Sequence, residues 1–328
     1  MPLSEVKSQE RAIDMLQTSV SERRIAHAYL FLGPDGVGKH SAAVEFAKLL
    51  NCALEKNDNC GKCASCTKIE KAIHPDIFII STEEGQRIIP IDKIRELSSR
   101  LSLKPFEARY RVAIIDAQSL NEESSNALLK TLEEPGADMV FILIAVNAIA
   151  LSDTIVSRCQ VVRFKPLSRH DVVNILKTDF DIDEKEAGFL ADLSGLNIKK
   201  ALSFKGRDAL SLKNAIIDEF ISDVALSEPG NKSMISLDRD MQLNSMDILL
   251  SFYRDVLVYK YTKDVSLIMN IDRQREILEF AKREDESSLN AAIGYIRETR
   301  TLLEANVNSK LAVKLLQERL AASDIGIC

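Results

Sequence analysis

A glycine-rich stretch, GPDGVGKH at residues 33–40, sets the strongest limit on how this chain can fold. It lies between an apolar run typical of a strand, residues 27–32, and a segment with helical spacing, residues 41–54. Glycines in such a turn let backbone N–H groups converge on phosphate oxygens, and the start of the following helix adds a positive field. The stretch therefore predicts a phosphate-binding loop in an α/β fold.

The residues of this loop follow the pattern G-x-x-x-x-G-K up to Lys39. Gly33, Gly36 and Gly38 would supply the close backbone approach, and Lys39 would reach the terminal phosphates of ATP or ADP. The next position normally offers a hydroxyl to Mg²⁺, and here it is His40, whose larger ring and nitrogens suit softer metals. The stretch predicts nucleotide binding without efficient hydrolysis; a ligand-free turn is the alternative.

A second departure from ATPase chemistry follows a third predicted strand, residues 110–116. Asp116, at its end, has the position of a carboxylate that helps to hold Mg²⁺, although it could equally hydrogen-bond a loop. The next residues are Ala117 and Gln118, and neither can accept a proton as a general base. We therefore expect a chain that is not an ATPase by itself.

The organisation of the chain changes near Pro166. Before it, strand-like runs alternate with helical segments, which favours a parallel α/β sheet. After it the pattern is helical, with long apolar stripes typical of a bundle, one of them over residues 289–320, and with a polar loop predicted at 226–233. The predicted strands are residues 27–32, 76–80, 110–116, 139–146 and 160–164, and the predicted helices between them are 41–54, 91–103 and 121–134. Asn121 can cap the last of these helices.

Charge and hydropathy exclude several classes of protein. The net charge of −6 disfavours a protein that coats DNA, because phosphate contacts need Lys and Arg. The most apolar run, residues 139–151, is shorter than the roughly 20 residues of a membrane span. The N-terminus has no apolar run of signal-peptide length. These features predict a cytoplasmic protein without a membrane partner.

Four of the six cysteines cluster as C-x7-C-x2-C-x2-C: Cys52, Cys60, Cys63 and Cys66. Short C-x-x-C turns let two thiolates bind one ion, and four thiolates complete a tetrahedral, structural Zn²⁺ site. An iron–sulfur cluster is a weaker alternative because the matching fourth C-P is missing. Unliganded thiols are the remaining alternative.

These motifs stand in an order that resembles the bacterial clamp-loader AAA+ proteins, the family of the delta-prime and tau/gamma subunits of DNA polymerase III. The resemblance is carried by HAYLFLGPDGVGKH, the four cysteines, HPDIFII, IDKIREL, YRVAIIDAQSLNEESSNALLKTLEEP and SDTIVSRCQVVRF. It covers residues 1–205 well and the remainder loosely.

The resemblance implies three domains: a P-loop AAA+ domain over 1–165 with the zinc module at 52–66, a three-helix lid over 166–206, and a helical collar over 207–328. It implies that the collar joins tau/gamma and delta subunits in a ring that loads the sliding clamp on primed DNA.

The resemblance also assigns roles to individual residues. Arg158, in the motif SRC, would act as an arginine finger in the ATP site of a neighbouring subunit; a surface Arg paired with a local acid is the alternative. Asn147 would sense the γ-phosphate or cap a loop. Lys199 stands where active members of the family place an Arg, and it lacks the bidentate fork of that residue.

The departures at His40, Ala117 and Lys199 favour the delta-prime type, a stator that donates its arginine finger and hydrolyses little or no ATP. An ATP-hydrolysing motor of the tau/gamma type is the rival interpretation. A basic stretch that includes Arg95 and Arg111 would meet DNA phosphates or form a solvated helix face.

Overall fold

The computed structural model describes residues 2–54, 57–82, 86, 88–102, 104–136, 138–149, 151–204, 209–221, 234–305 and 307–323. The chain divides into two compact units, of which the first ends at Asp171 and the second begins at Val172. The further division of the second unit into a lid and a collar stays a prediction.

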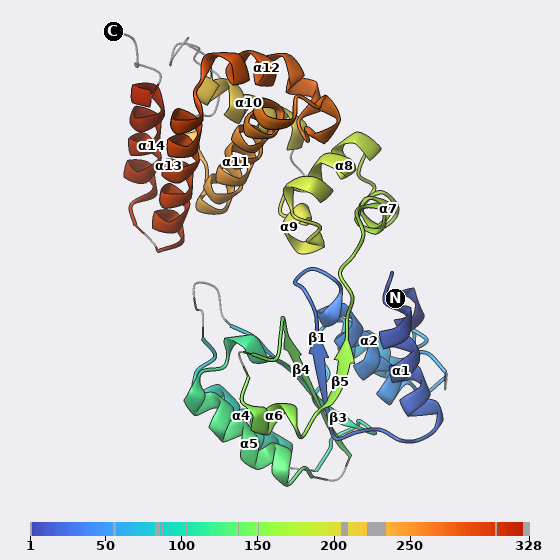
Figure 1. Cartoon of the computed structure of the whole chain (residues 1–328). Helices are drawn as coiled ribbons and strands as arrows, with labels where there is room; N and C mark the ends of the chain where they lie inside the picture. The colour runs from blue at the N-terminus through green and yellow to red at the C-terminus, as the bar shows by residue number, and fades with distance from the viewer. Residues whose placement is uncertain are drawn as a thin grey trace. The chain divides into compact units, whose positions relative to one another are not determined.

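The first unit is built on a five-stranded sheet with the order β2-β3-β4-β1-β5, in which all neighbouring strands are parallel (Figure 1). At its centre, Leu30 pairs with Leu143 on one side and with Val161 on the other. Because the strands are parallel, all their carboxyl ends lie at one edge of the sheet. The strands are β1 (Ala28–Leu32), β2 (Ile77–Ile80), β3 (Arg111–Asp116), β4 (Met139–Ala145) and β5 (Gln160–Arg163).

Helices cover both faces of this sheet. The helical elements of the first unit are η1 (Leu3–Glu5), α1 (Glu10–Ser21), α2 (Lys39–Asn51), α3 (Ala64–Glu70), α4 (Ile91–Ser102), η2 (Ala117–Ser119), α5 (Glu122–Glu133) and α6 (Asp153–Val156). All five predicted strands and the three predicted helices are confirmed, with ends displaced by a few residues. The predicted cap of α5 is also confirmed, since Asn121 Oδ1 accepts a hydrogen bond of 2.9 Å from Ser124 N.

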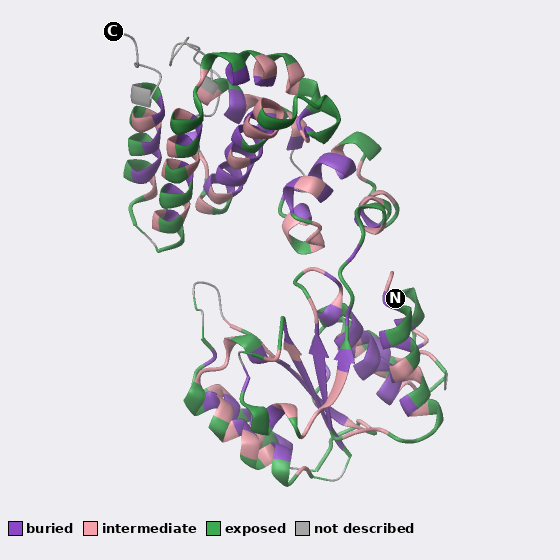
Figure 2. Ribbon diagram, viewed as in Figure 1, coloured by how far each residue is buried: buried purple, intermediate pink, exposed green. Residues whose placement is uncertain are grey.

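Alternation along the strands divides the core between the two faces. Leu30 and its alternate neighbours pack in one cluster with α4 and α5. On the other face, Tyr29 meets Phe46 of α2, with ring centroids 5.1 Å apart. Figure 2 shows the strands buried between helices whose outer sides are exposed. This arrangement confirms the predicted α/β class.

From α7 onward the described residues form helices and no strand. The elements are α7 (Arg169–Phe180), α8 (Glu184–Leu193), α9 (Ile198–Leu202), α10 (Ala209–Ile221), η3 (Met234–Ser236), α11 (Arg239–Thr262), η4 (Val265–Leu267), η5 (Ile271–Arg273), α12 (Gln274–Arg283), α13 (Glu286–Glu304) and α14 (Ser309–Ser323). The apolar stripe over residues 289–320 thus belongs to two helices. The polar loop predicted at 226–233 lies outside the described residues.

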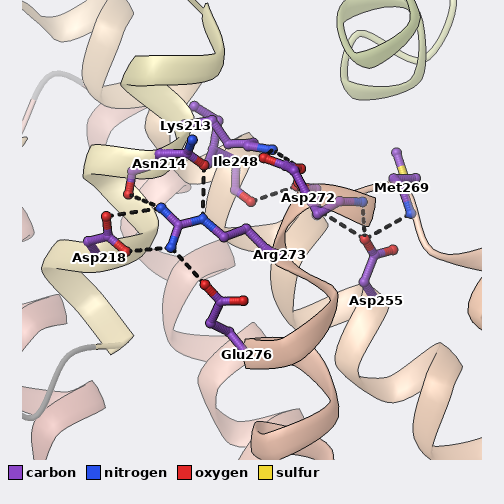
Figure 3. Close-up of polar contacts among 11 residues, drawn as sticks. Lys213, Asn214, Asp218, Ile248, Asp255, Met269, Asp272, Arg273 and Glu276 are labelled. Atoms are coloured by element: carbon purple, nitrogen blue, oxygen red, sulfur yellow. Dashed lines mark hydrogen bonds and ion pairs between the residues drawn. The ribbon is translucent and has the colours of Figure 1, made fainter. Parts of the chain in front are cut away.

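A polar network fastens the helices of the second unit (Figure 3). Lys213 of α10 is fully buried; its ammonium lies 2.5 Å from Asp272 and 4.8 Å from the centroid of the Phe189 ring. Arg273 binds both carboxylate oxygens of Asp218, at 2.7 and 3.0 Å. The short η5 helix is therefore held against α10 by two charged pairs.

No helix in the described part of the chain combines the length and the apolar character that a membrane span requires.

Candidate functional site

The Gly-rich loop lies between β1 and α2, as predicted, at the carboxyl edge of the sheet. Gly36 has a φ of 76° and Gly38 a φ of 93°, values that residues with a Cβ rarely adopt. At Gly33 a Cβ would lie 2.5 Å from the carbonyl oxygen of Phe164, which follows β5. The loop therefore depends on glycine for its backbone angles and for its close approach to the neighbouring chain.

Lys39 is folded back onto the loop. Its Nζ donates to the carbonyl oxygens of Gly33 and Pro34, at 2.5 and 2.6 Å, and lies 3.7 Å from the carboxylate of Asp35. Burial lowers the pKa of Lys39, although Asp35 and Asp116 raise it in part. To reach a phosphate, the ammonium would exchange these carbonyl oxygens for phosphate oxygens.

The carboxylate of Asp116 faces the same region from the end of β3. Its Oδ2 accepts a hydrogen bond of 3.1 Å from Ser119 Oγ, whereas its Oδ1 is buried and has no hydrogen-bond partner among the described residues. A buried carboxylate oxygen without a partner makes the folded state less stable unless a water, an ion or a ligand binds to it. Asp116 therefore bonds its own loop and also has an oxygen suited to a cation.

The structure places each of the other residues that the sequence assigned to the nucleotide site. His40 is exposed on the first turn of α2, where it offers no hydroxyl. Ala117 is 1% exposed and presents only a methyl group beside Asp116. Asn147 lies after β4, where its Oδ1 accepts from Ile149 N at 3.0 Å and so caps its own loop. Lys199 is exposed on α9 of the second unit.

Gln9 is a residue of this site that the sequence pattern did not single out. Its amide donates to Val37 O at 3.4 Å and to Lys165 O at 2.9 Å, and accepts from Lys165 N at 2.9 Å. It is 2% exposed. A lone Gln before a helix carries no signal of such a role, because both partners come from distant parts of the chain.

The four clustered cysteines meet in space. Their sulfur atoms all lie within 4.8 Å of one another. Four thiolates about 2.3 Å from one Zn²⁺ ion would be roughly 3.8 Å apart, so the set suits a tetrahedral site after a small contraction. Backbone N–H groups point at these sulfurs: Cys60 N lies 3.4 Å from Cys52 Sγ, and Cys63 N lies 3.3 Å from Cys60 Sγ.

The thiols of the cluster differ in acidity. Burial raises the pKa of Cys63, but hydrogen bonds, including those from the backbone N–H groups of Ala53 and Cys66, outweigh it and lower the value to about 6. Burial raises the pKa of Cys66. Thiolates are the form that binds metal, so this donor set fits Zn²⁺.

Arg158 lies at the opposite edge of the sheet from the Gly-rich loop, because it precedes β5 whereas the loop follows the parallel strand β1. It pairs with Glu133 at 2.8 Å, donates to Thr154 O at 2.9 Å, and its side chain is 35% exposed. The basic stretch is less continuous than expected: Arg111 is buried and bonds Leu101 O. Arg111 therefore forms no part of an exposed basic face.

Comparison with known proteins assigns the family. The family described as "DNA polymerase III, delta subunit" matches residues 8–168, and "DNA polymerase III, delta subunit, C terminal" matches residues 207–320. The DNA polymerase III delta-prime subunit of Bacillus subtilis (strain 168) is 30% identical over 310 residues, which cover 92% of each chain. The chain belongs to the DNA polymerase III clamp-loader subunits.

Other members of this family are also similar to the chain. The tau subunit of Bacillus subtilis (strain 168) is 30% identical over 284 residues, which cover 78% of this chain and 50% of tau, so the chain spans half the length of that relative. A solved gamma-subunit-related protein from Thermotoga maritima shares the fold, with a TM-score of 0.50 and 16% identity over 94% of this chain and 99% of that one. The predicted family and fold are confirmed.

Proposed function

We propose that this clamp-loader subunit acts in replication as a stator of the delta-prime type, which donates Arg158 to the nucleotide site of a neighbouring subunit. The observation that carries the proposal is the position of Arg158 at the amino edge of the sheet. The Gly-rich loop and Asp116 lie at the carboxyl edge, and a five-residue strand separates the two edges by roughly 15 Å. Arg158 therefore cannot reach a phosphate bound at its own loop, and a nucleotide that it contacts would have to be bound by another chain.

The same proposal assigns little or no ATP hydrolysis to the chain itself. Ala117 puts a methyl group where a general base would stand, and His40 supplies no hydroxyl to Mg²⁺. The loop and Lys39 would still hold the phosphates of ATP or ADP. We propose tau/gamma and delta subunits as partners through the helical second unit, with the sliding clamp and primed DNA bound by the assembled complex.

The test is a loader reconstituted from purified subunits with Arg158→Ala. An arginine finger contributes on the order of 10³-fold or more to the rate at the site that it completes. Clamp loading and stimulated ATPase activity should therefore fall sharply, while the fold is kept, because exposed ion pairs contribute about 0–1 kcal/mol.

Arg24→Ala is the matched control for this experiment. Arg24 also precedes a strand at the amino edge, its side chain is 82% exposed, and it also pairs with an acid, Glu22, at 3.2 Å. It should leave ATPase activity unchanged. Equal activities for the Arg158 and Arg24 variants would refute the finger role.

A motor of the tau/gamma type is the second candidate, favoured by the unpartnered buried oxygen of Asp116 among the described residues. Hydrolysis of radiolabelled ATP by the purified chain separates the two functions. Turnover at an ordinary enzyme rate that Lys39→Ala abolishes would establish the motor. We expect binding without such turnover.

We also propose that Cys52, Cys60, Cys63 and Cys66 hold one structural Zn²⁺ ion, which the cluster of sulfurs and the N–H groups aimed at them support. All four ligands would come from the protein, so the ion would have no open position for catalysis. Metal analysis should find one zinc per chain, and Cys60→Ser should lower that content. Absence of zinc from freshly purified protein would refute the assignment.

A further inference from the structure

The segment of residues 3–9, here called the N-terminal segment, joins three parts of the first unit that are far apart in the sequence. It contains η1 and ends at the start of α1. Leu3 is fully buried, Val6 is 7% exposed and Gln9 is 2% exposed. These three side chains are buried, whereas Ser4, Glu5 and Lys7 are exposed. Through its buried side chains the segment can transmit a displacement, because packed interiors deform little.

The first end of the segment is held by the turn that leads into the cysteine cluster. Asp58 Oδ1 and Asn59 Oδ1 both accept from Leu3 N at 2.8 Å, and Asp58 Oδ2 accepts from Ser4 N at 3.1 Å. Asn59 is 1% exposed, and its amide also donates to Glu45 of α2 at 2.8 Å.

The turn is adjacent to the cysteine cluster in the chain. Asn59 directly precedes Cys60, whose backbone N–H donates to Cys52 Sγ at 3.4 Å. Because Asn59 and Cys60 are joined by one peptide bond, a displacement of Cys60 on loss of the metal would displace Asn59 as well.

The other end of the segment contacts the Gly-rich loop. A Cβ placed on Gly38 would lie 3.5 Å from Val6 Cγ1, so the side chain of Val6 packs against the last glycine of the loop. Gln9 donates to Val37 O within the loop and exchanges two hydrogen bonds of 2.9 Å with the backbone of Lys165.

The same end also holds the chain that leaves the sheet after β5. Ser8 Oγ donates to Asp171 Oδ1 at 2.6 Å, and Asp171 Oδ2 accepts from the backbone N–H of Ser168 at 2.9 Å. The pKa of Asp171 is lowered to about 2 by the hydrogen bonds from Ser168 and Ser8, so it is ionised at neutral pH and these bonds are charge-assisted.

We infer, on the basis of the zinc site proposed above, that the Asp58–Asn59 turn is a positioning element of the nucleotide loop. The metal-bound cysteine cluster holds the turn, and the turn holds the N-terminal segment. The segment in turn holds the loop and the chain after β5. The zinc module, residues 52–66, would then hold residues 33–40 and 165–171 in place, although both segments lie outside it. Loss of the metal should loosen both.

The experiment measures amide hydrogen exchange in the full chain with zinc bound and after chelation. The reporter is the amide of Lys165, which donates to Gln9 Oε1 and lies far from the cysteines in sequence. On removal of zinc its exchange should accelerate roughly tenfold, together with that of Leu3 and Ser4. The core strand β4 should not change.

Variants test whether the effect of zinc reaches Lys165 through the Asp58–Asn59 turn and Gln9. In Asp58→Ala/Asn59→Ala the amide of Lys165 should exchange fast even with zinc bound, and chelation should add nothing. Asp58→Asn, which keeps one acceptor oxygen, should be intermediate. Gln9→Leu should release Lys165 while Leu3 stays protected.

Lys68→Ala is the matched control, because Lys68 lies on α3 beside the cluster and pairs with Glu107 at 2.6 Å. It should respond to chelation as the wild type does. The inference is overturned if chelation releases Leu3 and Ser4 but leaves Lys165 protected, if the double variant behaves as wild type, or if the chain binds no zinc. Exchange needs neither nucleotide nor partner subunits, so its outcome is independent of the role proposed for Arg158.

Discussion

Asp255 of α11 binds the chain that precedes η5 in the second unit, and we expect its substitution to destabilise that unit strongly. The side chain is fully buried. Its Oδ2 accepts three hydrogen bonds, from Met269 N at 2.9 Å and from Asn270 N and Asn270 Nδ2 at 2.8 Å. Those residues lead directly into η5, which carries Asp272 and Arg273 to their partners on α10 (Figure 3).

The magnitude follows from these contacts. A hydrogen bond to a charged group contributes about 1.5–3 kcal/mol, and a buried donor left without a partner costs about 1–3 kcal/mol. Asp255→Ala removes the acceptor of all three donors. Asn270 Nδ2 keeps a second hydrogen bond, to Ser251 Oγ at 3.3 Å, so the two backbone N–H groups are the donors left without a partner, and local movement and water would recover part of their cost. We expect a loss of about 4 kcal/mol in the free energy of unfolding, and about 1–2 kcal/mol for Asp255→Asn, which keeps one acceptor oxygen.

Thermal and urea unfolding of the second unit, followed by circular dichroism and calorimetry, measure this loss. For a unit of this size about 4 kcal/mol corresponds to a fall of roughly 10 °C in Tm. Arg254→Ala is the control, because Arg254 bonds the other oxygen of Asp255 at 2.8 Å from a half-exposed position and should change little. A loss below about 1 kcal/mol for Asp255→Ala, or equal losses for the Ala and Asn variants, would refute the reasoning.

Three further predictions concern the first unit. Gly33→Ala would place a Cβ 2.5 Å from Phe164 O and should cost about 1–3 kcal/mol in urea unfolding, whereas Gly61→Ala, with no atom within 4 Å and a φ of 65°, should cost less. Burial raises the pKa of the Asp76 carboxyl, but the N–H groups of the chain before β3 outweigh it and lower the pKa. Its stabilisation is therefore present above about pH 4 and lost as the pH falls below it, so Asp76→Asn should be less stable at neutral pH and less sensitive to acid than the wild type in parallel acid titrations. Asn121→Ala should cost about 1 kcal/mol in thermal unfolding through loss of the α5 cap; an unchanged Tm would contradict the role of its 2.9 Å hydrogen bond.

Local patterns were sufficient for much of the fold. The alternation of apolar runs and helical segments predicted every strand, because a buried parallel strand must be apolar on both faces. Asn121 predicted a helix start through its own side chain, and the cysteine spacing predicted a cluster that the structure brings together. These features depend on residues that are neighbours in the sequence.

Environments built from distant segments were not predictable in this way. Arg111 belonged to a basic stretch in the sequence, but it is buried in the structure because its strand turns that side chain toward α4. The partner of Arg158, Glu133, lies on another helix. The contacts of Gln9 with Lys165 span 156 residues of chain, and no periodicity or motif reports them.

Neighbouring residues alone predict the strands and helices, the glycine loop, the cysteine set and the departures at His40 and Ala117, since each of these is local chemistry. Which of these features come into contact depends on the packing of the whole unit. The strand order places β1 between β4 and β5, so the loop lies beside the chain that leaves the sheet, and the parallel direction puts Arg158 at the far edge. The fold also brings the turn before Cys60 into contact with the N-terminal segment. Such contacts form only when packing closes the chain on itself, because they join groups that no local rule connects.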